Sequence, residues 1–144
     1  PCETCMLNTK TRAVRPTFTF QLVDEADAPR YNDDGTPCMA TIHGPGSKRY
    51  AAAQSRRQNK LMAKAQRGQA AAETPEERLR NQAEFLTDIT EDLGVEYPGP
   101  EGQPLEGRAK LLAIYGDLEI GYIAEQVAKK SGDWANFTRG SATS

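Results

Sequence analysis

The segment PTFTFQL, residues 16–22, decides the fold class of this 144-residue chain. Phenylalanine and leucine alternate in it with threonine and glutamine, which is the two-residue period of a half-buried β-strand. A polar, turn-rich stretch follows over residues 24–36, and Cys38 to Ile42 predicts a second strand. Together they predict a β-hairpin over residues 16–43 with a long loop. Two strands alone are marginally stable, so we expect the hairpin to pack on a helix or to be completed by strands from another copy.

A basic helix is predicted directly after the hairpin. Ser47 follows the turn Gly44-Pro45-Gly46 and is a typical N-cap, and Gly68 marks the end, which predicts a helix over residues 47–67. The helix holds seven lysines and arginines and no acidic residue. At 100° per residue its charges fall on one broad side, and a thin, alanine-rich apolar stripe lies on the other.

An acidic helix comes next. Thr74, Pro75 and Glu77 give an N-cap, a proline at the first helical position and a glutamate at the third, which predicts a helix over residues 75–93. One arc carries its apolar residues, whereas acidic residues occupy the opposite arc. We therefore expect this helix to be central to the core, and the apolar arc holds Leu79, Ala83, Phe85, Leu86, Ile89 and Leu93.

The last third predicts an irregular Gly- and Pro-rich connection over residues 95–107 and then C-terminal helices over residues 108–131. Gly116-Asp117 supplies a break and an N-cap between two short helices. Trp134 and Phe137 are expected to anchor the chain end in the core. Residues 1–15, without periodicity, predict an extended N-terminal arm, and residues 138–144 a flexible tail.

These elements predict an α+β fold, with an N-terminal β-hairpin packed against three to four helices in a single domain over residues 16–137. Residues 1–72 carry 11 Lys and Arg against 6 Asp and Glu, and residues 73–144 carry 7 against 14, so the halves differ in sign. Three cysteines, an odd number, fit a reducing compartment. No apolar run is long enough to span a membrane, so we expect a soluble, cytoplasmic protein.

A metal site is one candidate for chemistry. Cys2 and Cys5 have the spacing of a zinc knuckle, and Cys38 with His43 could complete four ligands. However, Cys38 and His43 lie five residues apart on a predicted strand and therefore point to opposite faces. We expect reduced cysteines and no bound metal.

Catalytic residues and a cofactor are not predicted either. The only histidine, His43, precedes a Gly-Pro-Gly turn and has no paired acid or nucleophile in its sequence context. Gly44 to Lys48 lacks the glycine spacing of a phosphate-binding loop. The acidic pairs in the chain do not have the ligand spacing of a calcium loop.

The basic helix is the strongest candidate for binding. Its charges fit an acidic surface in the same chain or in a neighbour. They also fit the phosphates of a nucleic acid, although only Tyr50 is an interleaved aromatic and the sequence pI is about 5.5. The predicted partner-binding residues in the arm and the helix are Arg12, Arg15, Arg56, Arg57, Lys60, Lys64 and Arg67.

The order of elements resembles a group of small proteins from tailed bacteriophages. A two-stranded start, a basic helix, a capped acidic helix and a Gly/Pro connection precede Tyr115-Gly116-Asp117, Ile123-Ala124-Glu125-Gln126-Val127 and Trp134-Ala135-Asn136-Phe137. With this ending the chain, over residues 17–137, resembles tail-assembly-chaperone-like phage proteins. The Cys-containing basic arm before Arg15 is a departure from the pattern.

This resemblance implies a non-enzymatic phage morphogenesis protein that acts by protein–protein contacts in the host cytoplasm. Its partners would be tape-measure and tail-tube proteins, and we expect a homo-oligomer. The arm favours an alternative, a structural virion protein such as a capsid cement, head–tail connector or tail component, with capsid subunits as further partners. A second alternative is a nucleic-acid-binding protein that uses the basic helix.

Overall fold

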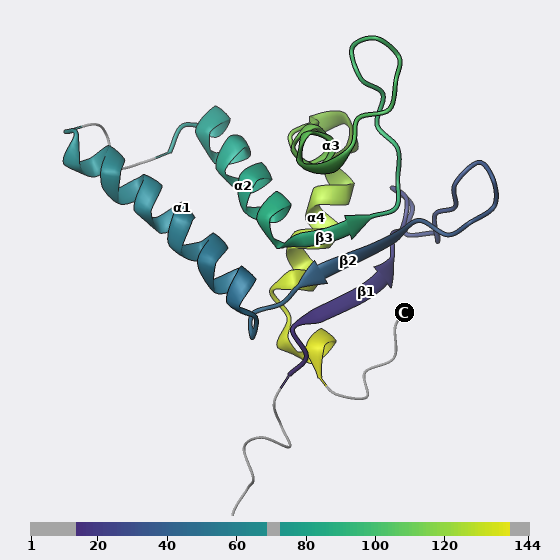
Figure 1. Cartoon of the computed structure of the whole chain (residues 1–144), viewed down its shortest axis with the longest axis horizontal. Helices are drawn as coiled ribbons and strands as arrows, with labels where there is room; N and C mark the ends of the chain where they lie inside the picture. The colour runs from purple at the N-terminus through teal and green to yellow at the C-terminus, as the bar shows by residue number, and fades with distance from the viewer. Residues whose placement is uncertain (1–13, 69–72, 139–144) are drawn as a thin grey trace, which may run out of the picture.

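The computed structural model describes residues 14–68 and 73–138, and these residues form an α+β fold (Figure 1). The remaining residues, 1–13, 69–72 and 139–144, include most of the predicted arm and tail. Within the described ranges, no helix is both long and apolar enough to cross a bilayer. The elements are β1 (Thr17–Gln21), β2 (Met39–His43), α1 (Lys48–Gln66), α2 (Pro75–Ile89), β3 (Thr90–Leu93), α3 (Gly107–Tyr115), η2 (Leu118–Ile120), α4 (Gly121–Ser131) and η3 (Trp134–Phe137).

The predicted hairpin is confirmed and gains a third strand from the same chain. β1 pairs antiparallel with β2, with Phe18 opposite Ile42, and β2 pairs antiparallel with β3, with Ala40 opposite Leu93. The strand order is β1-β2-β3. The third strand of the sheet, β3, thus comes from the same chain.

The predicted extent of the acidic helix was wrong at its C-terminal end. α2 ends at Ile89, and Thr90 has extended backbone angles and begins β3. Ile89 and Leu93 are four residues apart, which fits a helix, but Thr90 and Leu93 are the two buried residues of a strand. Pairing with β2, far away in the sequence, decides between these two conformations.

Both predicted helix starts are confirmed. The Ser47 side chain accepts a hydrogen bond from the Tyr50 N–H at the start of α1. Thr74 accepts one from the Glu77 N–H, and the Glu77 carboxylate accepts the Thr74 N–H, which completes the capping box of α2. Local sequence signals therefore fix where these helices begin.

One face of the sheet carries the core. Phe18, Phe20, Ala40 and Ile42 point to this face and are buried against the helices, and α4 passes behind the sheet in Figure 1. The opposite face carries half-exposed polar residues, and the hydroxyls of Thr19 and Thr41 lie 2.9 Å apart on it. The alternation in residues 16–22 thus predicts the buried face correctly.

The C-terminal anchor is Phe137 alone. Its ring is fully buried, packs edge-on against Phe18, and lies directly against Gly44. The prediction that Trp134 belongs to the core was wrong, because 56% of Trp134 is exposed. Trp134 lies at the rim beside Gly46, one 3-10 turn before Phe137.

A buried polar pair joins α3 to the start of β3. The hydroxyl groups of Tyr115 and Thr90 lie 2.6 Å apart, and Thr90 also donates to the Leu86 carbonyl. Burial raises the pKa of Tyr115, so its hydroxyl stays protonated at all ordinary pH values. The buried polar atoms of these two residues are thus satisfied where α2 changes into β3.

Candidate functional site

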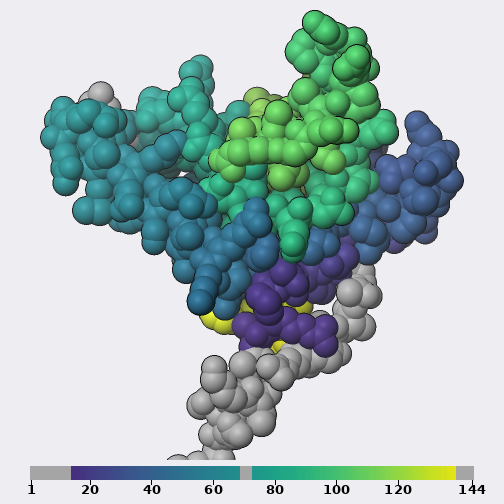
Figure 2. Space-filling view, viewed as in Figure 1, coloured from purple at the N-terminus to yellow at the C-terminus, as the bar shows by residue number. Residues whose placement is uncertain are grey.

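Helix α1 is the least buried long element of the described structure. Ala53 is the one buried residue among its 19 positions. The helix lies beside α2, where Tyr50 meets Phe85 edge-on at a centroid distance of 5.3 Å and the Arg57 guanidinium lies 5.8 Å from the Phe85 ring centre. These few apolar contacts leave most of the helix surface in solvent, as the left side of Figure 2 shows.

The charged side of α1 borders α2 and forms a ladder of three ion pairs. Arg56 pairs with Asp88, Lys60 with Glu84, and Lys64 with Glu77. On α1 the basic residues follow one another every four positions, while on α2 the acidic partners run in the opposite direction. This pattern requires two antiparallel helices that present complementary charges.

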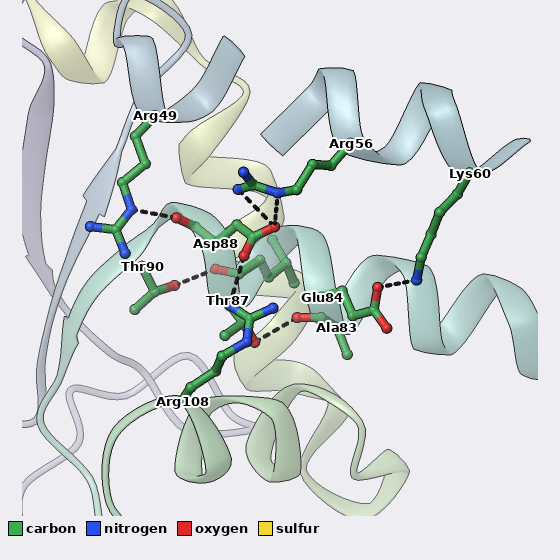
Figure 3. Close-up of polar contacts among 10 residues, drawn as sticks. Arg49, Arg56, Lys60, Ala83, Glu84, Thr87, Asp88, Thr90 and Arg108 are labelled. Carbon is green, nitrogen blue, oxygen red and sulfur yellow. Dashed lines mark hydrogen bonds and ion pairs between the residues drawn. The ribbon is translucent and has the colours of Figure 1, made fainter. Parts of the chain in front are cut away.

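Asp88 is the hub of this interface (Figure 3). Its Oδ2 lies 3.1 Å from a terminal guanidinium nitrogen of Arg56, and its Oδ1 accepts a 2.7 Å hydrogen bond from Arg108 on α3. Arg49 donates to the Asp88 backbone carbonyl at 2.6 Å. Only 11% of the Asp88 side chain is exposed, so this carboxylate links α1, α2 and α3 from a largely buried position.

The far end of the ladder is the Lys64–Glu77 pair. The Lys64 Nζ lies 2.9 Å and 2.7 Å from the two carboxylate oxygens of Glu77. The hydrogen bond from Lys64, and then that between Glu77 and Thr74, lowers the pKa of Glu77 below its usual value. Glu77 therefore stays ionised at neutral pH and serves both the capping box and the ladder.

Away from the ion-pair ladder, α1 carries exposed residues with uncharged side chains, next to the exposed Lys48 at its N-terminal end. We name this set the outer face of α1. It runs over the length of the helix, and one of its members, Met62, is 51% exposed. The outer face comprises Ala51, Ala52, Ser55, Gln58, Met62, Ala65 and Gln66.

The predicted partner-binding residues lie in different places, and Arg57 lies over the Phe85 ring of α2. Arg56, Lys60 and Lys64 pair with α2 of the same chain, which is one of the two alternatives that the sequence left open for the basic helix. Arg67 is the exposed C-cap of α1. Arg15 lies at the start of the described chain, where its backbone N–H donates to the Phe137 carbonyl. Arg12 lies outside the described residues.

The candidate metal ligands are not brought together where the structure describes them. Cys38 is buried, and its thiol donates to the Asn32 side chain, whereas His43 lies on the opposite face of β2. Burial raises the pKa of Cys38, which keeps it a neutral thiol. Cys2 and Cys5 precede the described residues, and residues 14–68 and 73–138 contain no group of three or more His, Cys, Asp or Glu placed to hold a metal ion.

His43 is held in its neutral form. Burial is the main cause that lowers its pKa, and the positive charge of Arg49 adds to it, while Glu91 opposes the shift from an Nε2–Oε2 distance of 3.6 Å. The unfolded chain has the ordinary value of 6.5. Since the folded pKa is depressed, the unfolded state binds more protons, and stability is lost as the pH falls below 6.5 toward the folded pKa.

We therefore expect the melting temperature of the wild-type chain to fall between pH 7.5 and pH 5.5, and that of His43→Gln to fall less. Thermal denaturation followed by circular dichroism across this range measures both. The carboxylates titrate mainly below this range and contribute little to the difference. Parallel curves for the two proteins would contradict the assignment of a depressed pKa to His43.

Sequence reasoning did not identify the partners of the basic helix. It did not single out Asp88, and it left open whether the acidic surface lies in this chain or in a neighbour. Arg56 and Lys60 are four residues apart, as are Glu84 and Asp88, and this equal spacing is a signal for antiparallel pairing. The third pair departs from it, because Lys60 and Lys64 are four residues apart whereas Glu77 and Glu84 are seven apart.

No protein-family model, curated protein or solved structure matches this chain.

The sequence motifs of the C-terminal third hold the fold together. The Asp117 side chain caps η2 and accepts a hydrogen bond from the Tyr97 hydroxyl. Gln126 bonds the Val23 backbone, and Asn136 donates to the Lys130 carbonyl.

Proposed function

We propose that this chain is a non-enzymatic phage morphogenesis protein, a tail assembly chaperone that binds tape-measure and tail-tube proteins. The observation that carries the proposal is the outer face of α1, an exposed and uncharged surface on a helix that buries one residue. The resemblance of the C-terminal motifs to tail-assembly-chaperone-like proteins supplies the class of partner. The host cytoplasm during assembly is the corresponding location.

The physical argument concerns what α1 contributes. Tertiary packing of an apolar face stabilises most helices in proteins, since isolated helices of this length are marginal in water. Here α1 buries only Ala53, and among the carboxylates of the ladder Asp88 alone is largely buried, so the other pairs contribute little. A helix of 19 residues that adds so little to the core is better explained by a contact with another protein.

Nucleic-acid binding has less support. That alternative depended on Arg56, Arg57 and Lys60 as free cations for phosphates. Arg56 and Lys60 are engaged with carboxylates of α2, and Arg57 lies over Phe85. Each phosphate contact at these positions would have to displace an intramolecular partner.

The test is co-expression of the chain with the tape-measure protein of the same phage. We expect more soluble tape-measure protein than with an unrelated helical protein of similar size, and a complex that survives size-exclusion chromatography. Failure to increase the soluble fraction or to form a complex contradicts the proposal. Mass spectrometry of purified virions separates the alternatives, because a chaperone is absent from particles and a structural component is present.

A further inference from the structure

The free edge of β1 is a second surface, separate from α1. In the described part of the chain, β1 has one neighbour in the sheet, β2, and forms the lower border of the sheet in Figure 1. The Gly44 N–H donates to the Pro16 carbonyl, and the Leu22 N–H donates to the Cys38 carbonyl. The backbone N–H and C=O groups of the even-numbered residues in this strand therefore point toward β2. In an antiparallel ladder the alternate residues face away, and the backbone groups of Thr17, Thr19 and Gln21 therefore point outward.

The chain itself closes the edge at both ends of this gap. On one side, the Arg15 N–H donates to the Phe137 carbonyl. On the other, the Gln126 carboxamide accepts from the Val23 N–H at 2.7 Å and donates to the Val23 carbonyl at 2.8 Å, as the backbone of a neighbouring strand would. The backbone groups of Arg15 and Val23 also point outward. Within residues 14–68 and 73–138, the outward backbone groups of Thr17, Thr19 and Gln21 therefore lie without a backbone partner between these two bonded positions.

The open part of the edge lacks the devices that keep sheet edges apart. Natural edge strands carry charged residues, proline or bulges that prevent pairing with another chain. The strand Thr-Phe-Thr-Phe-Gln has none of these, and its register with β2 is regular over residues 17–21. A hollow beside this edge, lined by Gln21, Tyr122 and Gln126, leaves space next to its C-terminal end.

We propose that this edge pairs with the same edge of a second copy, antiparallel about a two-fold axis at Thr19. Thr19 then lies opposite Thr19 of the second copy, and Thr17 opposite Gln21. Each of these three pairs exchanges two backbone hydrogen bonds, about six in all, and joins the two sheets into one.

A second copy fits better than a foreign strand for two reasons. The three open positions are symmetric about Thr19, so a dyad there satisfies all of them at once. Residues 17–21 are uncharged, so two copies of this strand meet without like charges opposite each other. The dimer leaves α1 exposed. The proposed dimer does not depend on the proposed chaperone role, and either can be wrong without the other.

The experiment measures the mass of the full chain by sedimentation equilibrium over a range of concentrations. The wild type is expected to form a dimer. Thr19→Lys places two like charges opposite each other at the dyad and should raise the dimer dissociation constant about a hundredfold. Thr41→Lys is the matched control, because it loses the same Thr19–Thr41 contact on the same face but lies on the inner strand, and it should dimerise like the wild type.

A charge-pairing experiment separates loss of the contact from loss of the fold. Thr19→Lys and Thr19→Glu should each be monomeric alone, and an equimolar mixture should regain a dimer, because opposite charges then meet at the dyad. A wild type that stays monomeric overturns the proposal. So does a Thr19→Lys variant that dimerises as strongly as the Thr41→Lys control.

Discussion

Replacing Phe137 with alanine is expected to lower the free energy of unfolding by about 3–5 kcal/mol, the cost of removing a fully buried aromatic ring. The ring connects the chain end to Phe18 on β1 and to Gly44 after β2. Urea denaturation followed by circular dichroism measures the change. A loss below about 1 kcal/mol would show that η3 does not anchor the fold.

The contact between the Phe137 ring and Gly44 allows a second test of the same anchor. A Cβ atom at Gly44 would overlap the Phe137 ring, so Gly44→Ala alone should cost about 1–3 kcal/mol. With Phe137→Ala the space is open, and the second substitution should then cost little, so the two effects are not additive. Gly121→Ala is the control, because nothing lies near its Cβ position and its stability should change little. Additive effects would contradict the proposed contact.

Replacing Asp88 with alanine is expected to cost about 1.5–3 kcal/mol and to loosen α1, because it leaves Arg56 and Arg108 close together without their shared carboxylate. Glu84→Ala is the matched control on the same helix. Glu84 holds one lysine and is 32% exposed, so its loss should cost less than about 1 kcal/mol.

Urea denaturation gives the stability of both variants, and hydrogen exchange gives the local stability of α1. In Asp88→Ala the amides of Lys48–Gln66 should exchange faster relative to those of α2 than they do in Glu84→Ala. Equal effects of the two substitutions would show that Asp88 is no more important than an ordinary surface ion pair.

Local patterns predicted most of the fold. The alternation in residues 16–22 gave the strand and its buried face, and Ser47 and Thr74 gave the helix starts, because capping and side-chain period are local properties. β3 was missed, since Ile89 and Leu93 are four residues apart and fit the apolar arc of a continuing helix. Its pairing with β2 depends on contacts about fifty residues apart in the sequence.

The candidate site was harder to predict than the fold. The sequence singled out Arg56, Lys60 and Lys64 correctly as a charged side but could not decide whether their partner was in the same chain. That depends on the angle between α1 and α2, which no short motif encodes. The sequence showed only a thin apolar stripe on this helix, and the structure leaves most of that side exposed.

The central claim, that the outer face of α1 binds the tape-measure protein, is tested most directly by charging that face. Ser55→Glu with Met62→Glu places two carboxylates on it. The matched control, Ala28→Glu with Gln103→Glu, adds the same charge at exposed loop positions. The measurement is the soluble fraction of co-expressed tape-measure protein. The account predicts full solubilisation by the wild type and the control and a loss of at least about tenfold with the α1 variant; equal solubilisation by all three proteins would contradict it.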